Sequence, residues 1–113
     1  MISVKNSEQI KLMKEAGRIT GEALLLAGEA VKPGVTTKHL DTIIRRHIES
    51  CGAKPSFLGY AGFPGSACIS INDQVIHGIP GSRVIEEGDI VKIDVGAYYK
   101  GFHGDSANTF PVG

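Results

Sequence analysis

Two segments in the first half of the chain repeat apolar residues at the spacing of an α-helix. Residues 7–31 carry an apolar residue every three or four positions, and a Pro-Gly pair then ends the segment. Thr36 or Thr37 can cap a second segment, whose apolar residues share one face as far as Gly52. Glycine is typical of the position that follows a helix. The pattern predicts two amphipathic helices.

The second half of the chain changes to the period of two that is typical of strands. Residues 67–71 and 90–98 alternate apolar and polar side chains, and residues 102–110 return after a turn near Lys100-Gly101. Residues 55–66 are glycine-rich and are predicted to form a loop. Two helices followed by an antiparallel sheet predict an α+β fold, with residues 1–113 as a single unit.

Composition fits a folded domain and argues against two classes of partner. The chain has 113 residues, 42% of them hydrophobic, and its twelve basic residues balance twelve acidic ones. A chain with no net charge has no overall electrostatic attraction to nucleic acid or to an anionic membrane surface. Residues 1–22 show no uninterrupted apolar core of the kind found in signal peptides, and these 113 residues contain no apolar run of about eighteen residues and no CxxC pair. We therefore expect a cytoplasmic protein with free thiols and no membrane or nucleic-acid partner.

Two aspartates occupy unusual positions in the last third of the chain. Asp94 lies inside an apolar strand, although aspartate is depleted in strands because its short polar side chain prefers turns and caps. Asp105 follows eleven residues later, on the strand that returns alongside. A turn at residues 99–100 would place the two directly opposite each other, and a turn at 100–101 would place Asp94 opposite Ala107. Both registers put the two aspartates on one sheet face, whereas a turn with one more residue would separate them.

Two ionised carboxylates on one face of adjacent strands repel each other. The pair could share a proton, face an intervening lysine or arginine, or bind cations. Oxygen ligands suit hard or borderline divalent metals, and paired metal ions are a known device for hydrolysis. A solvent-facing pair near Lys92 and Lys100, without function, is the alternative. The spacing favours a metal-dependent hydrolytic site.

Two further features could contribute to such a site. His77 lies in the run Val-Ile-His-Gly-Ile-Pro, whose glycine and proline restrict the backbone just after the imidazole. A histidine presented in this way can donate to a substrate or move a proton, although a structural role is the alternative. Phe57, Tyr60 and Phe63 lie in the glycine-rich loop, where they either close over the core or line a pocket.

These motifs, in their order and spacing, resemble those of the type I methionine aminopeptidases. The resemblance rests on residues 68–80, 88–95 and 101–106, with further matches at 13–18 and 32–37, so it spans nearly the whole chain. It implies the N-terminal half of a pita-bread fold, also called creatinase/aminopeptidase-like, in which two helices pack on a curved antiparallel sheet. It also implies removal of the initiator methionine from nascent proteins whose second residue is small.

The resemblance also implies roles for individual residues. Asp94 would bind one of two divalent metal ions, Asp105 would bridge both, and His77 would be the catalytic residue that contacts the substrate near the scissile amide. The ions could be cobalt, manganese, iron, zinc or nickel. The pocket for the methionine side chain would be lined by Phe57, Tyr60, Phe63 and Cys68.

Three features depart from the family's pattern. Ala61 stands where many bacterial relatives carry a histidine, and Phe57 replaces a smaller residue; both changes would alter the pocket without touching the metals. The remaining ligands of the family, one histidine and two glutamates, belong to a C-terminal half that these 113 residues do not include. His103 shares the strand face of Asp105, but the family does not use it as a ligand, so we expect it to be packed or to lie behind the ligands.

The partial ligand set leads to two expectations for the isolated chain. We expect it to be inactive or nearly so, because two aspartates alone make a weak metal site. We also expect it to pair with a C-terminal half or to self-associate through exposed apolar surface and strand edges.

Two other functions are compatible with the sequence. An Xaa-Pro aminopeptidase or dipeptidase on the same fold would share the two aspartates, although the Ile-His-Gly-Ile-Pro run favours the methionine enzyme. A non-catalytic pita-bread module would bind proteins, but such modules usually lose the metal-binding aspartates, and both are present here.

Overall fold

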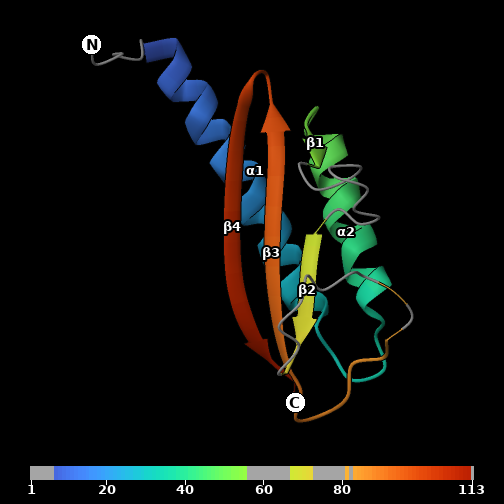
Figure 1. Cartoon of the computed structure of the whole chain (residues 1–113). Helices are drawn as coiled ribbons and strands as arrows, with labels where there is room; N and C mark the ends of the chain where they lie inside the picture. Colours follow the sequence, from blue (N-terminus) through green and yellow to red (C-terminus); the bar gives the residue numbers. More distant parts are fainter. Residues whose placement is uncertain (1–6, 56–66, 73–80, 82, 113) are drawn as a thin grey trace.

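Two helices precede a four-stranded antiparallel sheet in the computed structural model, which describes residues 7–55, 67–72, 81 and 83–112 (Figure 1). The helices are α1 (Ser7–Ala30) and α2 (Thr37–Ser50). The strands are β1 (Lys54–Pro55), β2 (Ala67–Ile71), β3 (Ile90–Tyr99) and β4 (Phe102–Pro111). The predicted α+β order is therefore confirmed. Neither of the described helices is long and apolar enough to cross a lipid bilayer.

The ends of α2 follow from its capping residues. Thr36 is the N-cap, and its side-chain oxygen accepts a hydrogen bond from the His39 amide at 3.1 Å. Gly52 follows the helix with φ of +77°, a backbone conformation that costs glycine little. Both residues act as the sequence predicts.

β3 is the central strand of the sheet. It pairs with β4 along its whole length, and its other edge pairs with β2 and, further along, with β1. Lys100 and Gly101 both have positive φ, 47° and 91°, which is typical of a two-residue type I′ hairpin turn. The prediction of a loop from Pro55 is wrong at its first residue, because Pro55 pairs with Ala97 as part of β1.

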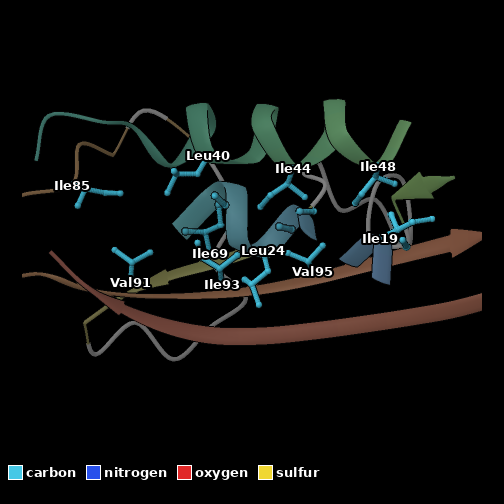
Figure 2. Close-up of a cluster of buried hydrophobic side chains, with 14 of the residues drawn as sticks. Ile19, Leu24, Leu40, Ile44, Ile48, Ile69, Ile85, Val91, Ile93 and Val95 are labelled. Atoms are coloured by element: carbon cyan, nitrogen blue, oxygen red, sulfur yellow. The ribbon is translucent and has the colours of Figure 1, made fainter. Parts of the chain in front are cut away.

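Both helices cover the same face of the sheet, and the core lies between them and the strands (Figure 2). β3 alternates buried and exposed residues along most of its length, so every second side chain enters this core. Burial of each Ile, Leu or Val side chain stabilises the fold by about 1.5–3 kcal/mol. The largest side chains that the core buries completely are Ile19, Leu40, Ile44, Ile48, Ile69, Ile85, Val91, Ile93 and Val95.

α1 approaches the sheet most closely where β4 has a glycine. A Cβ added to Gly104 would lie 2.6 Å from the backbone carbonyl carbon and oxygen of Ala16 and 2.8 Å from the amide nitrogen of Gly17. Helix and strand backbones therefore touch at this point. One turn closer to the start of α1, Leu12 lies beside Tyr99 and Lys100 of the hairpin. Ile10 is 43% exposed, although its spacing predicts that it shares the buried face of the helix.

A polar network joins the end of β2 to the start of β3. The Asn72 side chain donates to Asp89 Oδ1 and accepts from the Ile90 amide, each at 2.9 Å. The Glu86 amide donates to Asp89 Oδ2 at 2.9 Å. These hydrogen bonds, the one from Glu86 first, lower the pKa of the Asp89 carboxyl below its ordinary value.

Asp89→Asn is expected to lower the midpoint of thermal unfolding at neutral pH by several degrees. The ionised carboxylate favours the fold because its pKa is lower when folded than when unfolded. This stability is therefore present above about pH 4, the ordinary value of aspartate, and is lost as the pH falls through the lower folded value. Calorimetry of wild type and variant between about pH 7 and pH 2 should show the two midpoints converging in acid. Glu87→Gln, at an exposed neighbour, is the matched control; a difference independent of pH would contradict the assignment.

Candidate functional site

The sheet face that points away from both helices carries the predicted ligands. On β3, Val95 enters the core while Asp94 points to the other side. On β4, the Ser106 hydroxyl lies 3.1 Å from Thr20 of α1, which leaves Asp105 on the side of Asp94. We call this surface the open face; among the described residues it consists of Lys54, Cys68, Ser70, Ile90, Lys92, Asp94, Gly96, Tyr98, His103, Asp105, Ala107, Thr109 and Pro111.

The register of the hairpin places Asp94 and Asp105 as diagonal neighbours. Asp94 lies opposite Ala107, and Asp105 lies opposite Gly96. Diagonal side chains on one face have Cβ atoms within about 7–8 Å of each other. The predicted common face is thus confirmed, in the register that follows from a turn at Lys100-Gly101. Each carboxylate faces a small residue, so no bulky cross-strand side chain separates the two.

The electrostatics of this pair fit a bound cation. Partial burial, and then the charge of Asp105, raise the pKa of the Asp94 carboxyl above its ordinary value. Within the described part of the chain, neither aspartate forms an ion pair with a lysine or arginine. The alternative of an intervening lysine or arginine therefore has no such contact among the described residues. Two carboxylates with uncompensated repulsion and only oxygen donors match the ligand preference of hard or borderline divalent ions.

Cys68 borders the pair on the β2 side. It lies directly opposite Asp94 in the sheet, and burial, together with the charge of Asp94, raises the pKa of its thiol. The thiol is therefore held neutral and presents a small, weakly polar surface beside the carboxylate. Asp41 of α2 fixes the start of this strand, because its Oδ1 accepts a hydrogen bond from the Ala67 amide at 2.9 Å.

His103 lies on the open face, as the alternation of β4 predicts. Its ring packs against Tyr98 of β3, with the ring centroids 4.6 Å apart and the planes inclined at 48°. The remaining predicted site residues lie outside the described residues, so their roles stay predictions: His77, Phe57, Tyr60, Ala61 and Phe63.

The contact made by Asp41 is not predictable from the sequence pattern. An acidic residue on the face of α2 that also carries Leu40 and Ile44 was the available signal, but its partner 26 positions away could not be read from spacing.

Solved structures place this fold among the pita-bread peptidases. The chain superposes on methionine aminopeptidase from Rickettsia prowazekii with a TM-score of 0.93 and 40% identity, covering 100% of this chain and 46% of that one. It also superposes on the prolidase from Pyrococcus furiosus with a TM-score of 0.82 and 27% identity, covering 97% of this chain and 31% of that one. The predicted pita-bread half, with two helices on an antiparallel sheet, is confirmed.

The chain belongs to metallopeptidase family M24, whose sequence profile matches residues 11–113. It is 51% identical to methionine aminopeptidase 1 of Bacillus subtilis and 55% identical to the methionine aminopeptidase of Clostridium perfringens. These alignments cover 100% of this chain and 46% and 45% of the relatives, so the chain spans about half the length of the curated relatives it matches. The resemblance to methionine aminopeptidases is therefore confirmed.

Proposed function

We propose that this chain forms the N-terminal half of a methionine aminopeptidase and supplies Asp94 and Asp105 as metal ligands. The observation that carries the proposal is the placement of both carboxylates on the open face, with no cationic side chain paired to either within the described residues. The sequence identities of 51% and 55% with the two bacterial methionine aminopeptidases support methionine as the residue removed. The substrates would be the N-termini of nascent proteins, in the cytoplasm.

The residues of this chain would bind and orient rather than complete the reaction alone. Divalent ions, two in number by the family resemblance, would supply the Lewis acidity that amide hydrolysis needs. Asp94 and Asp105 hold their charges on one face of the hairpin, and a bound cation would relieve their repulsion. Cys68, held neutral beside Asp94, would form one wall of the methionine pocket.

Residues outside the described ranges complete the proposal. His77 would donate a hydrogen bond to the substrate near the scissile amide. Phe57, Tyr60 and Phe63 would supply apolar surface for the methionine side chain, because aromatic rings bury large areas. Ala61 and Phe57 would then set the width and polarity of this pocket.

An Xaa-Pro peptidase is the second candidate, since the prolidase from Pyrococcus furiosus shares the fold. We expect this chain, joined to a second half of the same family, to cleave Met-Ala peptides and to leave Xaa-Pro and Leu-Ala peptides uncut. We expect the 113-residue chain alone, with metal added, to be inactive or nearly so, because two aspartates fix an ion on one side only. Release of free methionine, measured by chromatography, distinguishes these outcomes.

Light scattering on the isolated chain serves as a control on that experiment. Leu25 is 64% exposed on α1, and β4 pairs only with β3 among the described strands, so we expect self-association. Cleavage of Xaa-Pro in preference to Met-Ala would reject the proposed substrate, and full activity of a monodisperse 113-residue monomer would reject the need for a second half.

A further inference from the structure

Three metal-ligating side chains meet where α1 packs beside α2. Glu22 comes from α1, His47 comes from α2, and Cys51 is the C-cap residue that follows α2. One ligand atom of each residue lies within 4.8 Å of the others, which makes this the only such group of three among the described residues. The three residues lie on the helices, whereas the open face lies on the opposite side of the sheet. The cluster is therefore separate from Asp94 and Asp105.

The distances within the cluster are close to those that a bound ion would impose. His47 Nε2 lies 3.2 Å from Glu22 Oε1 and 3.7 Å from Cys51 Sγ. A tetrahedral zinc ion, with bonds of about 2.0–2.3 Å, would hold nitrogen and oxygen about 3.4 Å apart and nitrogen and sulfur about 3.6 Å apart. The two distances from His47 Nε2 are thus already close to those around a zinc ion. The third, from sulfur to carboxylate, is at most 4.8 Å and would close to about 3.6 Å by rotation of the glutamate side chain.

Local structure explains why the ligands converge. His47 and Cys51 are four residues apart, so they project from the same side of α2 on consecutive turns. Cys51 is the C-cap and packs partly against the core, which restricts its position. The His47 side chain is 21% exposed and that of Glu22 is 43% exposed, so an ion could enter from solvent and keep a water as a fourth ligand.

Arg18 is the one cationic side chain that contacts a member of this cluster within the described part of the chain. Its Nη1 donates to Glu22 Oε1 at 2.6 Å, and it also pairs with Glu15, to which its Nε donates at 3.1 Å. Because Glu15 can hold the guanidinium by itself, Glu22 can turn toward an ion without leaving Arg18 unpaired. Arg18 nevertheless places a positive charge beside the cluster and should weaken cation binding.

We propose that Glu22, His47 and Cys51 bind a zinc ion, or another borderline divalent cation, that fastens α1 to α2. A thiolate, an imidazole and a carboxylate form a ligand set that zinc prefers, whereas the open face offers carboxylates that suit harder ions. The two sites would therefore differ in metal preference. The helix site would stabilise the packing of the helices behind the sheet and would not contact the substrate.

The test uses the full-length protein with Asp94→Asn and Asp105→Asn, so that the open face no longer binds metal. Added Co²⁺ should give a thiolate-to-metal charge-transfer band in the near ultraviolet. Zn²⁺ should displace the cobalt and raise the midpoint of thermal unfolding. Cys51→Ser should remove the band, and His47→Gln should weaken Zn²⁺ binding in calorimetry by at least about tenfold. Cys68→Ser, at the other cysteine, should leave the band unchanged.

Arg18→Gln should strengthen Zn²⁺ binding, which is the opposite of the effect expected for His47→Gln. Without the guanidinium, Glu22 is released and Zn²⁺ should bind about twofold to fivefold more tightly. Far-ultraviolet circular dichroism checks that each variant is folded, and the near-isosteric Cys51→Ser decides the outcome if His47→Gln unfolds. A band that survives Cys51→Ser, a band lost on Cys68→Ser, or no zinc binding by the parent would overturn the proposal.

Discussion

Replacing either Asp94 or Asp105 with asparagine in the full-length protein should lower kcat for a Met-Ala peptide by at least about a thousandfold. That factor corresponds to about 4 kcal/mol of transition-state stabilisation, which is within the several kcal/mol attributed to metal ions. An amide keeps the size of the carboxylate but loses its negative charge, so the ions are held poorly. The measurement is steady-state kinetics at saturating metal, with bound metal quantified in the same samples. Glu87→Gln, at an exposed carboxylate outside the open face, should leave kcat unchanged.

The loss of activity in Asp94→Asn should not be accompanied by a loss of stability. In the presence of a chelator, Asp94→Asn should unfold at the same temperature as the wild type or at a higher one, because the charged Asp94 is disfavoured by its burial and by Asp105. A residue needed only for folding would lose stability and activity together. A variant that is both inactive and clearly less stable without metal would therefore contradict the assignment of Asp94 as a ligand.

Gly104→Ala should be the most damaging small substitution for folding. Its Cβ would lie 2.6 Å from backbone atoms of Ala16, and a backbone cannot rotate away as a side chain can. Helix and strand would have to separate, at a cost of about 1–3 kcal/mol or more, and Gly104→Val should prevent folding. Urea unfolding followed by circular dichroism measures the loss.

Gly17→Ala is the matched control on the other side of this contact. A Cβ at Gly17 meets nothing within 4 Å, and alanine favours a helix over glycine by about 1 kcal/mol. The two glycine-to-alanine changes should therefore have opposite signs. Equal destabilisation by both would show that the close approach at Gly104 is not the cause.

The periodicity of the sequence predicts the strands β3 and β4, which carry most of the open face. Alternation along β3 separates Asp94 from the core residues, and a hairpin near residue 100 brings Asp105 back to the same side. The choice between the two possible registers follows from turn chemistry. A type I′ turn needs positive φ at both central residues, and Gly101 supplies one of them easily, whereas Tyr99 would not.

Contacts between distant segments were not predictable from local pattern. The hydrogen bond from the Ala67 amide to Asp41 and the contact between His47 and Glu22 both join elements whose relative position depends on helix packing. Nothing near His47 in the sequence identifies its partner on α1. Pro55 in β1 was assigned to a loop because proline lacks an amide hydrogen and is found in sheets mainly at edges.

The two-residue turn at Lys100-Gly101 also constrains how this hairpin can change in evolution. If the loop kept two residues, adding or removing one residue there would shift β4 by one position against β3, and Asp105 would then point at α1. Its place beside Asp94 would pass to a neighbour such as Gly104 or Ser106, neither of which carries a carboxylate. An inserted residue must therefore be held in a longer loop, such as the three-residue loops that also close hairpins, so that the pairing of β3 with β4 is kept. Relatives that keep both aspartates are expected to vary in length within the loop and not within the two strands.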